Sequence, residues 1–286
     1  MTLYRITTGH VHGILELTDQ VRIPGAPALP GGWTLEPYDA TDTKADVEIS
    51  LGTPDVTAGP HTVHIRLTRA AATSDTFAHV TYTALERLRQ RQRKITVHAT
   101  ALVAPDGRAL LLLGAKSAGK TSTALALAER GWIHAGDDLV VLGASGDGTV
   151  EVWPGKPTAA VRDPQQPLAP KAQLSLFPFT AGPSPLAWVV RVAVHPVLRT
   201  RSLTPAVPLT LNERLRLHEL LARYISGLPT PLGVTGMPYG TVWPLDSPAL
   251  ARQRHELIHL LAACRYDYLH APDAQTAADL LDKEAG

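Results

Sequence analysis

The spacing of apolar residues divides the chain into two stretches with different patterns. In the first stretch, residues 47–51 (VEISL) and 63–67 (VHIRL) alternate apolar and polar positions, a pattern that predicts half-buried β-strands. Residues 83–93 follow a helical pattern that ends in a run of basic side chains. We therefore assign residues 1–94 to a smaller N-terminal α+β domain.

From residue 95 onward, apolar runs replace the alternation. Residues 95–104 and 109–113 are typical of strands, and the turn sequence PDGR at 105–108 between them predicts a β-hairpin. The other predicted elements are helices at 120–130, 212–224, 250–264 and 274–283 and strands at 139–142, 149–153 and 188–197. Residues 95–286 are expected to form one α/β domain.

A long stretch from Pro154 to Pro185 contains eight prolines and little periodicity. Loops of this length are uncommon inside compact domains and usually carry function or remain disordered. We expect this one to be a lid or an acceptor-binding segment. Residues 227–248 form a second Pro/Gly-rich loop.

Composition narrows the classes of partner. The 286 residues carry 27 basic and 26 acidic side chains, for a net charge of +1, which argues against a nucleic-acid partner. The basic run at 87–94 is therefore expected to be a solvated helix end. The N-terminus lacks the apolar region of a signal peptide, and no apolar run is long enough to span a bilayer. We expect a cytoplasmic protein that has no membrane partner.

The segment GAKSAGKT at 114–121 matches the phosphate-loop pattern G-x-x-x-x-G-K-[ST] at every position. Its glycines let successive backbone N–H groups point into one cavity, where a following helix N-terminus also favours phosphate. Lys120 is expected to reach the β- and γ-phosphates of ATP, and the Thr121 hydroxyl to coordinate Mg²⁺. The predicted nucleotide-binding residues are Gly114, Ala115, Lys116, Ser117, Ala118, Gly119, Lys120, Thr121 and Ser122.

Asp137 and Asp138 directly precede the predicted strand at 139–142. On their own, two adjacent acids can be a polar turn. After a phosphate loop they suit phosphoryl transfer, which needs one carboxylate to hold Mg²⁺ and a group to orient or deprotonate the attacking hydroxyl. Adjacency in the sequence does not say which aspartate has which role.

Taken in order, these residues resemble the HPr kinase family and its relatives, including the kinases found with lasso-peptide biosynthesis. The likeness covers roughly residues 96–162. Its segments are Val97-His98-Ala99, the hairpin into the phosphate loop, Arg130-Gly131, Gly136-Asp137-Asp138, Trp153-Pro154-Gly155-Lys156-Pro157 and Arg162. Residues 171–187 do not match the second glycine-rich signature of the bifunctional kinase/phosphorylases, so the biosynthesis-associated branch is the more similar one.

The resemblance implies a P-loop kinase domain of HPr-kinase-like type, with ATP and Mg²⁺ as cofactors. Such an enzyme transfers the γ-phosphoryl group to a hydroxyl of a peptide or small-molecule acceptor. By the same resemblance Asp137 is the general base, Asp138 and Thr121 are on the metal side, and His98 tunes the acid pair. Lys156 and Arg162 are implied as a clamp for the acceptor or a phosphate.

Two other functions stay open at this point. One is a nucleotide-binding regulatory module without transfer activity. The other is a zinc metallopeptidase, because His255-Glu256-Leu257-Ile258-His259 matches H-E-x-x-H, in which two imidazoles one helical turn apart bind Zn²⁺. A third ligand is available only from Asp279, Asp282 or Glu284, so we expect this segment to be a packed helix. The oligomeric state stays open.

Overall fold

The computed structural model describes residues 2–8, 11–18, 21, 28–29, 33–39, 43–73, 75–161, 170–225 and 245–285. The chain is a mixed α/β protein that divides into two compact units. One unit contains residues 1–95 and 221–254, and the other contains residues 96–220 and 255–286. None of the helices described is long and apolar enough to cross a membrane.

A sheet of seven strands forms the first unit, in the order β3-β4-β1-β2-β5-β7-β6. The strands are β1 (Thr2–Thr7), β2 (His12–Leu17), β3 (Ala28–Leu29), β4 (Trp33–Pro37), β5 (Val47–Leu51), β6 (Asp55–Ala58) and β7 (Val63–Leu67). The β2–β5 and β5–β7 pairs are parallel. The strands predicted at 47–51 and 63–67 are confirmed as β5 and β7, and their apolar residues are buried except for the partly exposed Leu51.

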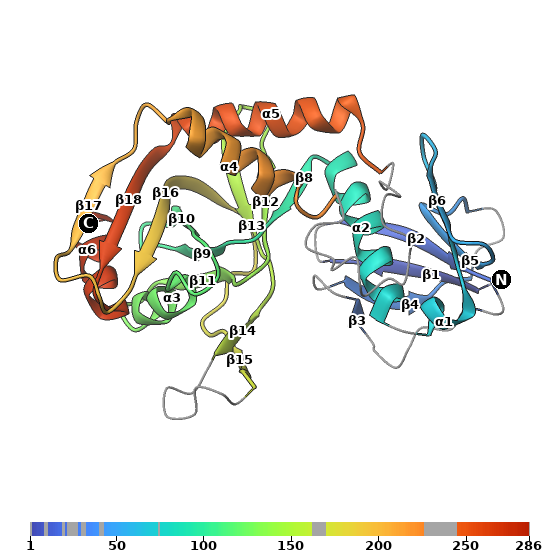
Figure 1. Ribbon diagram of the computed structural model, residues 1–286, viewed down its shortest axis with the longest axis horizontal. Coiled ribbons are helices and arrows are strands. Elements are labelled where there is room, and N and C mark those ends of the chain that lie inside the picture. The colour runs from blue at the N-terminus through green and yellow to red at the C-terminus, as the bar shows by residue number, and fades with distance from the viewer. Residues whose placement is uncertain are drawn as a thin grey trace. The chain divides into compact units, whose positions relative to one another are not determined.

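Two helices, α1 (Arg69–Ala72) and α2 (Asp75–Arg91), follow this sheet, and α2 lies across it (Figure 1). The prediction of a solvated basic end is wrong for Arg87 and Arg89, which are 8% and 1% exposed. Arg87 Nε donates to the Leu245 carbonyl (2.9 Å), and Arg254 Nη1 donates to Gln90 Oε1 (2.8 Å). These buried bonds join residues 245–254 to the first unit, whereas the sequence placed them in the second domain.

Nine strands form the large sheet that carries the second unit. They are β8 (Lys94–Val97), β9 (Thr100–Val103), β10 (Ala109–Leu113), β11 (Ile133–Gly136), β12 (Val140–Ala144), β13 (Val150–Trp153), β16 (Ser184–Val194), β17 (Ser202–Pro205) and β18 (Arg265–Ala271). The main path runs β11-β9-β10-β16-β13-β12-β8, and β18 pairs with both β16 and β17. Strands β10, β16 and β18 are mutually parallel, while β9 and β10 pair antiparallel.

Helices cover both faces of this sheet. On one face, α3 (Lys120–Ala128) and α6 (Ala274–Ala285) share one apolar core with Val190 and Val192 of β16 (Figure 1). Side chains alternate along a strand, so Arg191 points to the opposite face, where α4 (Leu211–Ala222) lies and Glu213 meets it. Helix α5 (Pro248–Ala263) buries Leu257, Ile258 and Leu261.

Two predicted segments differ from the structure, and a strand was missed. Residues 95–104 form two strands instead of one, separated by residues 98–99. Strand β8 pairs with β12, whereas β9 pairs with β10 and β11. The Pro-rich stretch contains a two-stranded hairpin of β14 (Thr158–Val161) and β15 (Ala172–Ser175). Strand β18 was not predicted.

The face covered by α4 holds a buried polar network around Glu213, which is 1% exposed. Its Oε1 accepts from Arg191 Nε (2.7 Å) and from the Tyr266 hydroxyl (2.5 Å), and its Oε2 accepts from the Tyr268 hydroxyl (3.4 Å). Burial raises the pKa of Tyr266, so this hydroxyl stays protonated and can donate. A buried carboxylate with partners of this kind joins α4 to β16 and β18.

We expect Glu213→Ala to lower the free energy of unfolding by about 3–5 kcal/mol, because it leaves a mostly buried guanidinium without its carboxylate. Arg216→Ala is the matched control: this arginine contacts the same carboxylate at 3.8 Å but is 52% exposed, and its loss should cost less than about 1 kcal/mol. Urea unfolding measures both values. Equal losses in the two variants would show that the buried network contributes no special stability.

Candidate functional site

The phosphate loop lies between β10 and α3, directly against the end of β16. Gly119 has a φ of +91°, and a Cβ there would come within 2.6 Å of Val194 Cβ. A Cβ on Gly114 would lie 2.9 Å from the Val192 carbonyl oxygen. The loop is pinned to β16 by a bond from Val194 N to the Ala118 carbonyl (3.0 Å). Gly114 is therefore required by the close approach of the Val192 backbone, and Gly119 by its positive φ and by the Val194 side chain.

Lys120 is the first residue of α3 and is only 6% exposed. Its Nζ donates to the carbonyls of Gly114 (3.0 Å) and Ala115 (3.1 Å), so the side chain folds back over the loop. Burial lowers the pKa of Lys120, while the charges of Asp138 and Asp137 raise it. The structure thus brings the motif lysine and the acid pair into one electrostatic group.

The other loop residues form the exposed part of the site. Ala115, Lys116 and Ser117 are exposed at the tip, and Ser117 has a φ of +67°. Ser122 is also exposed, one residue beyond Thr121 on α3. The tip of the loop is thus on the protein surface.

Asp137 is the buried centre of the site, with 1% exposure. Its Oδ1 accepts from Thr100 Oγ1 of β9 (2.5 Å), and the Thr121 hydroxyl of α3 lies 2.9 Å from Oδ1 and 3.1 Å from Oδ2. Sequence analysis missed Thr100. Its signal is a hydroxyl inside the otherwise apolar run ATALVA at 99–104. The two threonines fix the carboxylate between the hairpin strand and the phosphate-loop helix.

Asp138 adopts an unusual backbone conformation. Its φ is +60°, and Leu139 N donates to the Asp137 carbonyl across it at 2.7 Å, which closes a three-residue turn. Turns of this form are rare and strained for residues other than glycine, and such strain collects at functional sites. The Asp138 side chain is 41% exposed, and its Oδ2 lies 3.8 Å from Lys156 Nζ. Asp138 is thus the open member of the acid pair.

Residues 155–156 support this turn through backbone hydrogen bonds. Gly155 N donates to the Ala135 carbonyl (2.7 Å), and Lys156 N donates to the Leu139 carbonyl (2.9 Å). The Lys156 carbonyl in turn accepts from Asp137 N (3.1 Å). The backbones pass so closely that a Cβ on Gly155 would lie 2.1 Å from the Leu139 carbonyl oxygen. The first part of the Pro-rich stretch therefore shapes the acid pair.

Two histidines lie in this part of the second unit. His98 is half-buried at the break between β8 and β9. His134, which sequence analysis missed, is 2% exposed on β11, and its Nδ1 has no hydrogen-bond partner among the described residues. Burial lowers the pKa of His134, although the charge of Asp137 raises it. A neutral imidazole therefore lies within electrostatic reach of the acid pair.

Lys156 and Arg162 are the two residues predicted to clamp the acceptor or a phosphate. Lys156 contacts Asp138, as above, whereas Arg162 lies outside the described residues.

The H-E-x-x-H segment lies on α5, and the acids predicted as its third metal ligand bind other side chains. Asp279 pairs with Arg130, Asp282 accepts from Trp132 Nε1, and Glu284 pairs with Arg265. Among the residues described, no three His, Cys, Asp or Glu side chains are grouped to hold a metal ion.

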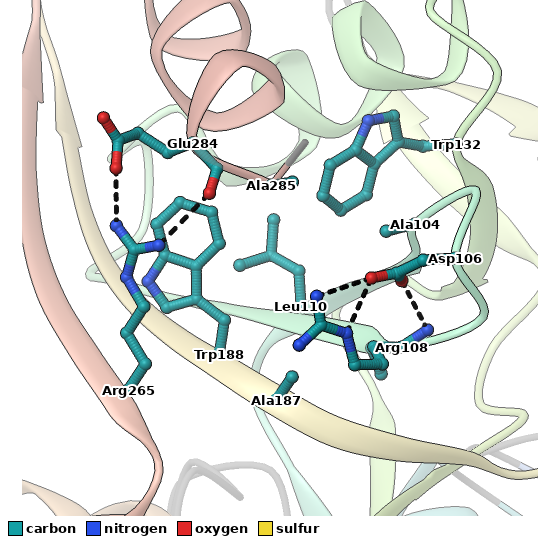
Figure 2. Close-up of a pocket in the computed structure, with 11 residues that line it drawn as sticks. Ala104, Asp106, Arg108, Leu110, Trp132, Ala187, Trp188, Arg265, Glu284 and Ala285 are labelled. Carbon is teal, nitrogen blue, oxygen red and sulfur yellow. Dashed lines mark hydrogen bonds and ion pairs between the residues drawn. The ribbon is translucent and has the colours of Figure 1, made fainter.

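A separate pocket of about 140 Å³ lies at the other end of β10. Figure 2 shows Trp132 and Trp188 on either side of Leu110, with Arg108 and Arg265 at the rim. The Arg265 guanidinium stacks over the Trp188 ring at 4.0 Å. Leu110 is near the start of β10, whereas the phosphate loop follows its end. This pocket is therefore separate from the phosphate loop.

Comparisons with known proteins add little to this geometry. No family model matches the chain, and no characterised protein matches its sequence. Among solved structures, the HPr(Ser) kinase/phosphatase from Coxiella burnetii is a weak neighbour, with 16% identity and a TM-score of 0.28. The likeness covers 34% of this chain and 58% of that protein. A functional assignment must therefore rest on the residues themselves.

Gly155→Ala is expected to distort the turn that carries the acid pair, because its Cβ meets backbone atoms that cannot rotate away. We expect a loss of at least about 1–3 kcal/mol in the free energy of unfolding, as for other overpacked sites. The control is Gly182→Ala in the same Pro-rich stretch, where an added Cβ meets nothing within 4 Å. Thermal unfolding compares the two variants, and equal melting temperatures would contradict the close crossing.

Proposed function

We propose that this protein is an ATP- and Mg²⁺-dependent kinase that transfers the γ-phosphoryl group to a hydroxyl of a peptide or small-molecule acceptor. The observation that carries the proposal is the pairing of Thr121 with the buried Asp137 beside Lys120. A phosphate loop alone supports nucleotide binding. A carboxylate bonded to the loop's own threonine adds what phosphoryl transfer requires.

The residues present suit both cofactors. The glycines at 114 and 119 keep Cβ atoms out of the curve of the loop, which suits close approach of phosphate to backbone N–H groups. Mg²⁺ prefers oxygen ligands and binds through one or two carboxylates together with phosphate oxygens, and the Thr121 and Asp137 side chains supply such oxygens. When bound, ATP with Mg²⁺ supplies the phosphoryl group and neutralises part of its charge.

The chain's own residues then have separate tasks. Lys120 provides a buried positive charge that stabilises negative charge on the transferring group, and such charges act more strongly in a dry site. One aspartate holds the metal, and the other accepts the proton from the acceptor hydroxyl. We assign contact with the acceptor or a phosphate to Lys156, whose Nζ lies 3.8 Å from Asp138 Oδ2.

The two aspartates allow two role assignments. The resemblance to HPr kinases makes Asp137 the general base and puts Asp138 with Thr121 on the metal side. The reverse is favoured by the hydrogen bonds from Thr121 to Asp137, which is buried, and by the exposure of Asp138. A base must reach the acceptor's proton, and an exposed carboxylate does so more readily.

Lys120→Ala tests the proposed function. We expect phosphoryl transfer to fall by at least about 10²-fold, because the backbone cradle cannot replace a lost positive charge. Lys283→Ala, which removes an exposed lysine from α6, is the control and should leave the rate unchanged. ³¹P NMR of ATP turnover with candidate hydroxyl acceptors is the measurement. Tight ATP binding without any turnover by the native protein would instead support a regulatory nucleotide-binding module.

Mg²⁺ titration of Asp137→Asn and Asp138→Asn separates the two assignments. Loss of the base lowers the transfer rate by about 10²–10⁴-fold at every Mg²⁺ concentration. Loss of the metal ligand weakens Mg²⁺ binding, so that added Mg²⁺ partly restores the rate. The geometry predicts rescue for Asp137→Asn and none for Asp138→Asn. The opposite pattern would support the assignment implied by the resemblance.

A further inference from the structure

The exposed surface of α4 and α5 in the second unit carries a cluster of imidazoles that the proposed kinase reaction does not use. His255 and His259 lie one turn apart on α5, and their Nε2 atoms are 2.9 Å from each other. Their ring centroids are 4.5 Å apart with an interplanar angle of 83°. Both side chains are exposed. The two imidazoles therefore meet nitrogen to nitrogen on the protein surface.

A third histidine supports the ring of His255 in this pair. The ring of His218, on α4, stacks on the ring of His255 with centroids 5.7 Å apart and an interplanar angle of 26°. A stacked ring presents its face to His255, so in this arrangement His218 supports the pair rather than joining it as a ligand. Groups around a metal-binding histidine fix its ring orientation in this way.

The imidazole nitrogens indicate the kind of ion. Metal–nitrogen bonds are about 2.0–2.1 Å long, so two nitrogens that bind one ion lie about 2.9 Å apart at a right angle and about 3.3 Å apart in a tetrahedral site. The 2.9 Å between the two Nε2 atoms is the length of the hydrogen bond that joins the rings, so an ion can replace this proton with a small shift of the two exposed side chains. Imidazole suits Cu, Ni and Zn ions, and Cu²⁺ binds most tightly in the divalent series.

We propose that His255 and His259 form a surface chelate for a divalent transition metal that takes imidazole ligands, with Cu²⁺ bound most tightly. The two Nε2 atoms supply adjacent ligands, and water completes the coordination. The ion takes the place of the proton that now joins the two imidazoles. The site is independent of the phosphate loop, because imidazole suits these metals whereas Mg²⁺ takes oxygen ligands.

The test is a Cu²⁺ titration of the untagged, full-length protein in excess Mg²⁺ and without nucleotide, followed by calorimetry and electron paramagnetic resonance. We expect one Cu²⁺ per chain, with a superhyperfine pattern from two nitrogens. His255→Ala and His259→Ala should each weaken binding by about 10²-fold, because losing one ligand removes the chelate's effective concentration. Both side chains are exposed, so we expect the variants to keep the native melting temperature.

His270→Ala is the control, since it removes another exposed histidine, on β18, at a distance from the pair in sequence. It should bind Cu²⁺ like the native protein. The proposal is overturned if the His255 and His259 variants bind as tightly as the native protein, or if His270→Ala loses as much affinity as they do. A stoichiometry of one ion for two chains would also overturn it, because the ion would then join two copies of the chain.

Discussion

The need to satisfy one buried carboxylate organises the site around Asp137. A carboxylate with 1% exposure is costly unless it is hydrogen-bonded. Thr100 from β9 and Thr121 from α3 meet this need from two elements that are not neighbours in sequence. The same bonds tie the phosphate-loop helix to the hairpin strand. Exchanging either threonine for valine would thus leave a buried charge short of a donor.

How far the sequence predicts this site depends on how local each feature is. The phosphate loop is contiguous, and the strand and helix predicted on either side of it are confirmed as β10 and α3. Thr100 and Gly155 lie outside this motif. They act on the site through contacts with residues that are 37 and 16 positions away in the sequence. Their contributions become visible only when the chain is folded.

Buried charges account for the larger errors. Arginine is mostly exposed in proteins, so the sequence predicted a solvent-exposed basic end of α2. In the structure, Arg87 instead donates a hydrogen bond to a carbonyl far along the chain. Strand β18 was hidden for a similar reason: Asp267, at its centre, argues against a buried strand. The structure buries that carboxylate because Trp188 Nε1 (2.7 Å) and Arg265 Nε (2.8 Å) both donate to it.

The phosphate loop and the H-E-x-x-H segment, two short sequence motifs, thus differ in how they are built into the folded chain. The phosphate loop is built into the fold, because β16 closes against its glycines and Asp137 bonds its threonine. The two histidines of the H-E-x-x-H segment lie exposed on α5, and the acids on α6 that could complete a zinc centre pair instead with Arg130, Trp132 and Arg265. Catalysis by a metal needs fixed coordination in a shaped, dry cavity. An exposed pair of imidazoles can chelate an ion without meeting that requirement.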